Sequence, residues 1–534
     1  MTGRSSGACV PGLGRRELLL LAPGLGVFRG RAPSAGDVFD VRAFGAVGDG
    51  RTIDTTAINA AIAAAAAAGG GTVLVPPGTY ASYSIRLRSR ITLRLAPGAL
   101  LLAATPHHGS GHCYDSAGPV ARWAAYQDFG HDHWRDSLIW GEGLHEVAIR
   151  GPGLIRGKGL STGLGHGDGL PPSDAPGAGN KTIALRNCRS VSLRDLNIVD
   201  GGHIGFLATG VDDLTVENLT IDTDRDGMDI DCCRNVRITG CRVNSPWDDG
   251  IALKSSYALG EVRATENVVI SDCTVTGRYR LGALVDGSFR CFAANRSPYG
   301  GKPVGRIKFG TESVGGFRNI TVSNCIFEGC RGLAIECVDG GIAEDITISG
   351  LTMRDIRNAP LFLRLGARMR APPGRPVGVL RRVSISDVVC EAPANAMPAI
   401  LSGIPGHPLE DIVLRNISIV QKGGGTAAMA RIVPPEETRF YPSPEAFGSL
   451  PAQGFFIRHA RNVLMRNLRI ASVEPDARPF VWLGNVQGVD TVGLRLARTD
   501  APAFMLNDVQ RFRAAACTGM QAARLASVRR RFVP

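Results

Sequence analysis

Several sequence features that indicate other classes of protein are scarce or missing in this 534-residue chain. No stretch reaches the roughly 18 consecutive apolar residues that a membrane-spanning helix needs, so we expect no membrane partner. Only 6% of the residues are aromatic, and the basic run Arg529–Arg531 has no aromatics interleaved, so nucleic acid is not an expected partner. The chain has 13 Cys but no pair of CxxC motifs, so the sequence predicts no zinc site.

The overall composition is that of a folded soluble protein. Hydrophobic residues make up 44% of the chain, and its 68 Gly follow no period of three, so neither disorder nor a collagen helix is expected. The formal net charge is +12. A basic surface of this size fits an anionic polymer substrate, and it fits an ordinary soluble protein equally well.

The first 35 residues resemble a targeting segment. The pair Arg15-Arg16 is followed by the short apolar run Leu18–Leu21 and, near residue 32, by small residues. This order is typical of a twin-arginine export signal, which predicts a periplasmic or secreted protein. The alternative is a disordered N-terminus with a chance arginine pair.

A phrase of alternating polar and apolar residues recurs along the chain and sets the expected architecture. It begins at nine positions, about 22 to 26 residues apart where the spacing is shortest: Val191, Leu214, Val236, Val268, Ile320, Ile346, Val383, Ile412 and Val463. Period-two alternation at this interval, broken by Asn, Asp and Gly, is typical of a parallel β-helix. A leucine-rich horseshoe would need a Leu-rich signature, which is missing. We therefore predict an all-β fold, a right-handed single-stranded parallel β-helix over residues 36–515, followed by a C-terminal tail over 516–534.

Two further features fit a solenoid. The Ala-rich residues 57–68 are strong helix formers, and we expect them to form a helix that covers the open N-terminal end of the cylinder. Four cysteines recur at one point of the phrase, and we expect them to stack as small buried side chains: Cys188, Cys241, Cys273 and Cys325.

Two acidic clusters are the strongest candidates for chemistry. Asp226 and Asp249 are 23 residues apart, which is one coil, so they should lie side by side, with Asp248 next to them. Another step of 23 residues back from Asp226 reaches His203, which we expect in the same column. Carboxylates held this close repel one another, which raises at least one pKa and supplies the acid and the base that glycoside hydrolysis needs. The alternative is that these aspartates only cap turns.

Residues 44–50 and 75–80 resemble the pectin-degrading β-helix superfamily, and Asp226-Gly227-Met228-Asp229 with Asp248-Asp249 resembles the polygalacturonase family, glycoside hydrolase family 28. The resemblance runs over about residues 38–492. It implies hydrolysis with inversion of a pectic glycosidic bond, without a cofactor or metal. By the same resemblance Asp248 would be the general acid, and Asp226 and Asp249 would hold the attacking water.

The chain departs from that family's pattern at three places. Asp224-Arg225-Asp226 stands where the family usually has Asn-Thr-Asp, and the histidine of its Gly-His-Gly falls on Val304. Glu336 stands where the lysine of the family's Arg-Ile-Lys is expected, and the similar run Arg306-Ile307-Lys308 lies one coil too early.

Without those cations a clamp for a substrate carboxylate is missing, so we expect a substrate other than plain polygalacturonan, such as a rhamnogalacturonan linkage or a neutral or terminal sugar. The candidate substrate-binding residues are His203, Asp229, Lys254, Lys308, Glu336 and Arg364.

Two insertions bear on how the substrate is cut. Residues 104–135 are rich in His, Trp and Tyr, and residues 277–305 separate the coils next to the acidic pair. Loops beside a groove tend to close it, so we expect cleavage from chain ends, with aromatic side chains stacking on sugars. The spacing of these histidines matches no standard metal-ligand pattern. We expect a monomer, and the alternatives for function are a polysaccharide lyase and a non-catalytic carbohydrate-binding β-helix.

Overall fold

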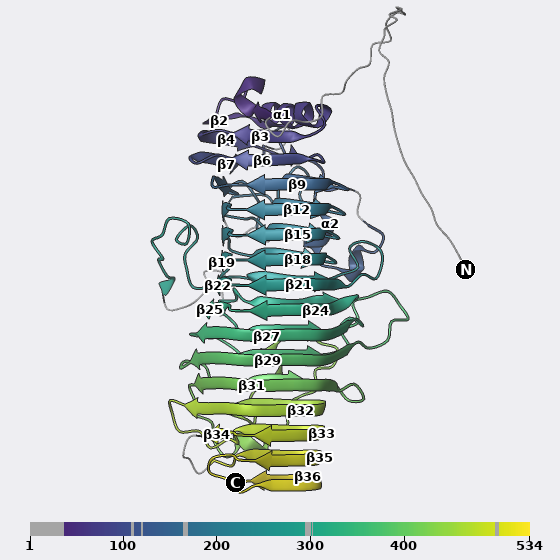
Figure 1. Cartoon of the computed structure of the whole chain (residues 1–534), viewed down its shortest axis with the longest axis vertical. Helices are drawn as coiled ribbons and strands as arrows, with labels where there is room; N and C mark the ends of the chain where they lie inside the picture. The colour runs from purple at the N-terminus through teal and green to yellow at the C-terminus, as the bar shows by residue number, and fades with distance from the viewer. Residues whose placement is uncertain are drawn as a thin grey trace, which may run out of the picture.

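The structure, a computed structural model, describes residues 37–107, 112–118, 121–163, 169–293, 301, 303–496 and 501–534. Its coils stack into a long rod, with helix α1 (Thr55–Ala67) at one end and strand β36 (Ala523–Val533) at the other (Figure 1). Successive coils pair in parallel along the rod. The prediction of an all-β parallel β-helix is therefore confirmed, while the predicted export signal lies outside the described residues.

The coils build three faces, each a column of parallel strands. One face contains β1 (Val38–Asp40), β3 (Gly71–Val75), β6 (Ile91–Leu95), β9 (His145–Arg150), β12 (Arg189–Arg194), β15 (Asp212–Glu217), β18 (Arg234–Thr239), β21 (Thr265–Ser271) and β24 (Gly316–Ser323). The predicted phrase begins on this face, in β12. The second contains β2 (Asp49–Ile53), β4 (Gly78–Ser82), β7 (Ala99–Ala103), β10 (Leu154–Arg156), β13 (Asn197–Val199), β16 (Thr220–Asp222), β19 (Arg242–Asn244), β22 (Thr274–Thr276) and β25 (Ile326–Glu328). The third contains β5 (Ile85–Arg86), β8 (Ser137–Glu142), β11 (Lys181–Arg186), β14 (Ile204–Thr209), β17 (Asp226–Asp231), β20 (Ile251–Ser255), β23 (Ile307–Ser313), β26 (Leu333–Cys337), β28 (Leu361–Leu365) and β30 (Ala399–Ser402).

In the C-terminal part of the rod, neighbouring faces merge into longer strands. β27 pairs with both β24 and β25, so one strand spans two faces. The strands of this part are β27 (Ile342–Arg354), β29 (Val379–Ala392), β31 (Leu409–Gln421), β32 (Phe455–Ser472), β33 (Val481–Val492), β34 (Arg495–Leu496), β35 (Phe504–Ala515) and β36.

The predicted repeat has the register that the sequence indicated. Its first apolar positions pair directly from coil to coil, from Val191 with Leu214 at one end to Ile412 with Val463 at the other. Every one of the nine side chains is buried. The alternate residues of each strand thus fill one continuous core, and the repeat cysteines Cys188, Cys241, Cys273 and Cys325 are buried and unpaired as disulfides.

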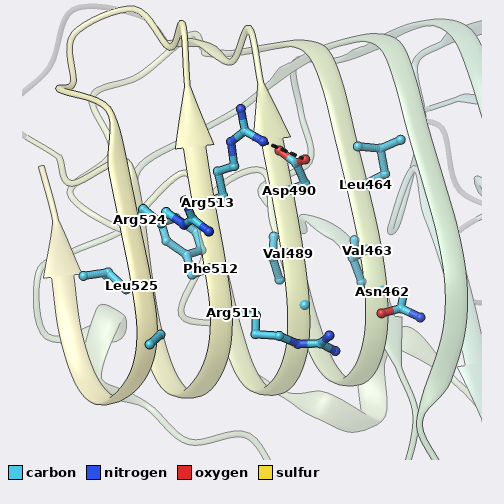
Figure 2. A pocket seen from close by; sticks show the side chains of 12 residues that line it. Asn462, Val463, Leu464, Val489, Asp490, Arg511, Phe512, Arg513, Arg524 and Leu525 are labelled. Atoms are coloured by element: carbon cyan, nitrogen blue, oxygen red, sulfur yellow. Dashed lines mark ion pairs between the residues drawn. The ribbon is translucent and has the colours of Figure 1, made fainter.

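The two described ends of the rod differ. At the N-terminal end α1 buries one side, which includes Ile58 and Ile62, and so confirms the predicted cap. At the C-terminal end β36 pairs antiparallel with β35, so the predicted tail over residues 516–534 contains the last strand of the sheet. An open groove of about 810 Å³ crosses these last rungs and is bordered by Arg511, Arg513 and Arg524 (Figure 2).

The few other helical segments are short. Among the residues that the structure describes, they are α2 (Phe129–Asp132) and the 3₁₀ turns Val41–Phe44, Ala124–Tyr126, Met429–Arg431 and Pro444–Phe447. No helix in the described part of the chain has the length and apolar character needed to cross a membrane.

Candidate active site

A polar cavity of about 230 Å³ opens on the third face of the rod, over β14, β17, β20 and β23. The strands supply its floor, because residues that alternate with the buried apolar ones point outward. Helix α2, which belongs to the insertion over residues 104–135, covers one side with Gly130 and His131. Tyr441, from the connection between β31 and β32, borders the cavity as well.

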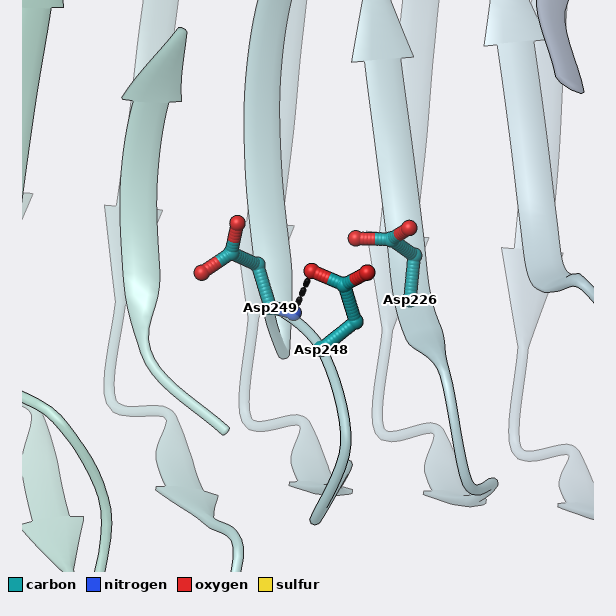
Figure 3. A group of neighbouring side chains, drawn as sticks. All are labelled: Asp226, Asp248 and Asp249. Atoms are coloured by element: carbon teal, nitrogen blue, oxygen red, sulfur yellow. Dashed lines mark hydrogen bonds between the residues drawn. The ribbon is translucent and has the colours of Figure 1, made fainter. Parts of the chain in front are cut away.

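Three aspartates meet in this cavity. Asp226 begins β17, and Asp248 and Asp249 lie in the turn before β20. The pairing of Met228 with Ile251 sets Asp226 beside Asp249 in the next coil. One carboxylate oxygen from each of the three lies within 4.8 Å of the others, and Asp248 projects between its two neighbours (Figure 3). The structure thus brings together the three carboxyl groups proposed from the sequence.

The surroundings push the outer two carboxyl groups in opposite directions. Burial, together with the nearby charges of Asp229 and Asp248, raises the pKa of Asp226 well above its ordinary value. Burial also acts on Asp249, but Lys308 and Arg306 outweigh it and lower the pKa of Asp249. Arg306 Nε lies 2.8 Å from Asp249 Oδ1, and Lys308 Nζ lies 3.1 Å from Oδ2. Of these two carboxyl groups, Asp226 is therefore the one whose surroundings favour the protonated form, and Asp249 is the one whose surroundings favour the ionised form.

Asp248 is the most accessible of the three, with 34% of its side chain exposed. Arg225 Nη2 lies 3.3 Å from Asp248 Oδ2, and its guanidinium lies over the ring of Trp247 at 5.1 Å. The backbone N–H of Asp249 donates to the other oxygen of Asp248 at 3.0 Å. Asp248 is thus held in place while it still faces the cavity.

A second group of charges lies behind the aspartates. Lys254 Nζ is 3.1 Å from Asp229 and 3.8 Å from Glu312. His131 places its ring nitrogens 3.5 Å from Asp229 and 3.0 Å from Asp231. Burial alone would lower the pKa of His131, but the charge of Asp231 and the contacts with both acids raise it to about 10. The histidine is therefore a buried cation, and it fixes α2 onto β17.

Glu312 and Asp128 share the far side of the cavity. Burial and the neighbouring charge of Asp128 raise the pKa of Glu312 to about 7. The pKa of Asp128 is lowered despite its burial, because it is bonded to Glu312 and lies near Lys254 and Arg370. One proton shared between these two carboxyl groups accounts for both shifts.

Lys308 links the cavity to a buried acid below it. Its ammonium lies 3.5 Å from Glu336, and Arg306 lies 3.4 Å from the same carboxylate. Thr311 donates to Glu336 at 3.0 Å, and the Tyr441 hydroxyl lies 3.2 Å from Lys308. Arg306 and Lys308, which lie one coil before the family's cation positions, therefore contact the acid that replaces one of those cations.

The structure corrects the predicted position of His203. Ile204, not His203, pairs with Asp226, so His203 lies opposite Arg225. This coil is one residue shorter than the next, and the predicted column is therefore displaced by one position. His203 still borders the cavity, and burial together with Arg225 and Lys181 lowers its pKa, so the ring is neutral.

Arg364, predicted to bind substrate, lies outside the cavity lining and is occupied elsewhere. It is buried and donates to Ser402 Oγ at 2.8 Å and to the carbonyls of Gly403, Glu436 and Glu437 at 3.1, 2.7 and 2.8 Å. Its guanidinium holds the segment that leads to Tyr441. Glu336 also lies outside the lining, directly below Lys308, whereas Asp229, Lys254 and Lys308 border the cavity.

The two insertions match the prediction only in part, because the first reaches the cavity through α2 but not through its described Trp and Tyr side chains. The aromatic residues of the first pack inward, with Trp123 donating to the carbonyl of Ala258 and Tyr126 against Tyr257, and none of its described aromatics lines the cavity. No described residue of 277–305 lines the cavity either. His131 belongs to the His-rich insertion that the sequence placed beside the groove. Sequence reasoning missed several other lining residues because loops deliver them or because their types are common on strands: Asp128, Arg225, Thr311, Glu312 and Tyr441.

The three aspartates are close enough for one oxygen from each to reach a common cation. Both oxygens of Asp249 are already engaged by Arg306 and Lys308, however, and Arg225 faces Asp248. A calcium site needs six to eight free oxygen ligands. An aspartate that already pairs with two basic side chains suits acid–base chemistry better than calcium binding.

Family models match two parts of the chain. Residues 181–367 match the right handed beta helix region, and residues 38–101 match the family described as rhamnogalacturonase A/epimerase, pectate lyase-like. The right-handed β-helix predicted from the repeat is confirmed. A probable polygalacturonase from Vitis vinifera is 26% identical over 419 residues, covering 73% of this chain and 75% of its relative.

Solved structures share the fold. An exopolygalacturonase from Thermotoga maritima superposes with a TM-score of 0.60 at 17% identity, covering 83% of this chain and 93% of the other. A family 28 exopolygalacturonase from Yersinia enterocolitica gives a TM-score of 0.58 at 16% identity, covering 85% and 78%. The resemblance to polygalacturonases noted from the motifs agrees with these matches.

Proposed function

We propose that this protein is a glycoside hydrolase that cleaves glycosidic bonds in pectic polysaccharides or oligosaccharides. The observation that carries the proposal is the group of three aspartates in one cavity, whose surroundings raise the pKa of Asp226 and lower the pKa of Asp249. A protonated and an ionised carboxyl in one cavity are the two groups that glycoside hydrolysis requires. The polygalacturonase similarity supports a pectic substrate.

In this proposal the three aspartates share one proton that moves during the reaction. Asp226 holds it in the free enzyme. A bound sugar presents its glycosidic oxygen to Asp248, the accessible carboxyl, and the proton passes from Asp226 to Asp248 within the coupled group. Asp248 then protonates the leaving glycosidic oxygen as that bond breaks. Water forms the new bond to the anomeric carbon and gives its proton to Asp226, which restores the starting state.

We further propose that the reaction inverts the anomeric configuration. The oxygens lie within 4.8 Å, and a spacing this short is generally associated with retention. Retention would need a free carboxylate as nucleophile, however. Each oxygen of Asp249 is bound by a cation. In this proposal Asp226, once it has passed its proton to Asp248, accepts the proton of the attacking water and is not the nucleophile. Water held beside Asp249 is the nucleophile that remains, and direct attack by water inverts.

The shape of the cavity supports cleavage at chain ends. Its volume of about 230 Å³ lies below the roughly 300–1,000 Å³ typical of pockets for larger ligands, which suits a single sugar unit. His131 of α2 covers one side and is locked to β17 by its ion pairs. We also propose export through the twin-arginine route, supported by Arg15-Arg16, and a monomeric state.

Incubation with a panel of pectic oligosaccharides, followed by proton NMR during the first minutes, tests the function and the stereochemistry together. We expect loss of one terminal unit at a time, with the opposite anomer appearing first. An unsaturated product absorbing in the ultraviolet, together with calcium dependence, would support a lyase instead. Binding with no product at all would support a carbohydrate-binding protein.

A further inference from the structure

We propose that the cavity binds an uncharged sugar unit at the scissile bond, and that it discriminates against a uronate there. This inference rests on the proposed function and specifies its substrate class. The observation behind it is that every positively charged side chain of the described cavity lining already pairs with a carboxylate of the protein.

Each lining cation has its own acidic partner. Arg225 lies 3.3 Å from Asp248, and Lys254 lies 3.1 Å from Asp229. Lys308 has two partners, Asp249 at 3.1 Å and Glu336 at 3.5 Å. His131 is the fourth cation of the described lining, and it lies between Asp229 and Asp231. A substrate carboxylate would have to displace one of these acids to gain a charge-assisted hydrogen bond.

The charges of the described lining balance without a ligand. Six acids border the cavity, namely Asp128, Asp226, Asp229, Asp248, Asp249 and Glu312, together with four bases, His131, Arg225, Lys254 and Lys308. The pKa values of two acids, Asp226 and Glu312, are raised. With those two protonated, four negative charges face four positive ones. A uronate would add a fifth negative charge next to Asp226, Asp248 and Asp249.

Glu336 is the residue that completes this neutralisation. It is fully buried below Lys308 and does not border the cavity, so it takes part through the two cations that it contacts. Without its charge, Arg306 and Lys308 would share Asp249 alone, and one positive charge would be left to attract a substrate carboxylate. Glu336 is therefore a positioning and specificity residue.

A matched pair of substrates isolates charge from shape. Oligogalacturonides ending at the non-reducing end in galacturonate or in its methyl ester differ by one charge and one methyl group, and rhamnose-ended and galactose-ended oligosaccharides extend the set. We expect kcat/KM at pH 6 to be at least roughly tenfold higher for the methyl ester than for the acid, since about 1.4 kcal/mol corresponds to tenfold. Equal or faster turnover of the acid form would overturn the inference and leave the proposed function standing.

A binding measurement separates the two claims. Asp226→Asn is titrated calorimetrically with the same oligosaccharides, so that affinity is read without turnover. An amide at this position removes the transferable proton but keeps the neutral charge of a protonated carboxyl and the Arg225–Asp248 pair. Tighter binding of the oligosaccharides with uncharged ends supports the inference, even if the wild-type protein hydrolyses none of them. That absence of hydrolysis by the wild-type protein would refute the proposed function. Equal or tighter binding of the acid ends overturns the inference, and no binding by any oligosaccharide overturns both.

The variant Glu336→Gln tests the source of the discrimination. We expect the ratio of acid to ester turnover to rise roughly tenfold, the size of one charge-assisted hydrogen bond. Glu344→Gln, which changes an acid paired with Arg381 and Arg382 on another face of the rod, is the matched control and should leave the ratio unchanged. If Glu336→Gln folds, as judged by circular dichroism and melting, with an unchanged ratio, then Glu336 does not set the specificity.

Discussion

Asp226 and Asp249 occupy equivalent positions in successive coils, two residues before the paired Met228 and Ile251, yet their pKa values are displaced in opposite directions. The difference comes from the next coil. Arg306 and Lys308 face Asp249 from that side. The acidic neighbours of Asp226 are Asp229 on its own strand and Asp248 and Asp249 in the next coil, and among the described residues no cation contacts it as closely. A repeating fold thus gives two identical side chains different protonation states.

Asp248→Asn is expected to reduce kcat by roughly 10²–10⁴-fold, because an amide cannot protonate the leaving oxygen. Substrate affinity and melting temperature should change little, since the side chain is partly exposed. Initial rates and calorimetric binding measure the two effects. The exposed Asp345, on the face formed by the repeat, gives the control variant Asp345→Asn, which should keep wild-type rates. An active Asp248→Asn enzyme would exclude Asp248 as the acid.

Lys308→Met is expected to shift the acidic limb of the kcat/KM profile to higher pH. Lys308 lowers the pKa of Asp249, which must be ionised to hold water, so losing one of its two cations raises that pKa. An opposite charge at this distance is worth about 1–3 pH units, and activity should be lost earlier on acidification by about that amount. An acidic limb that stays in place would show that Asp249 does not control it.

His131→Gln is expected to destabilise the fold by about 3–5 kcal/mol near pH 6, because it leaves Asp231 buried without its cation. The pKa of His131 is raised to about 10 in the folded protein, against 6.5 for a free histidine. The stabilisation from its ion pairs is therefore complete below pH 6.5 and is lost as the pH rises to 10. Wild-type stability should therefore fall across this window, and the variant should lack that fall. For Asp231, whose pKa is lowered to about 2, the stabilisation is lost as the pH falls from 3.8 to 2.

Urea denaturation at several pH values measures both slopes. His145→Gln is the control, because His145 pairs with the exposed Glu146 and should have little effect. A parallel pH dependence in wild type and His131→Gln would refute the ion pair as its source.

Arg364→Ala is expected to act on stability and not on the chemical step. Four acceptors lose the Arg364 donor, although the Gly403 carbonyl keeps its hydrogen bond from Ser402 Oγ. An acceptor left buried and unsatisfied costs about 1–3 kcal/mol before water enters. We expect a marked loss in the free energy of unfolding, with kcat of the folded fraction within roughly tenfold of wild type. The exposed Arg466 supplies the control Arg466→Ala. If the variant is stable and its KM is raised, the result would instead support the predicted role of Arg364 in substrate binding.

The coil register could be read from the sequence because it follows from apolar alternation. Val191 and its eight counterparts form one column, and the same period placed Asp226 beside Asp249. His203 was placed one residue too early because turns can lose a residue without disturbing the strands, and no apolar position records the loss.

The rest of the site depends on long-range contacts that periodicity does not determine. Arg364 points outward from a strand like a ligand-binding residue, and only the path of residues 436–437 shows that carbonyls occupy it. His131 and Tyr441 come from connections whose course no repeat constrains. The sequence pattern thus predicts what the strands present, and it is silent on what lies over them.

The reversal of direction at β36 has a consequence for how such rods meet one another. A parallel coil left bare would offer its backbone groups to a second molecule, and cylinders could then stack into a filament. Here the final strand runs the opposite way and has Arg529, Arg530 and Arg531 exposed along it. Two molecules approaching through this end would bring like charges together, so fibre growth from that end is opposed by electrostatic repulsion.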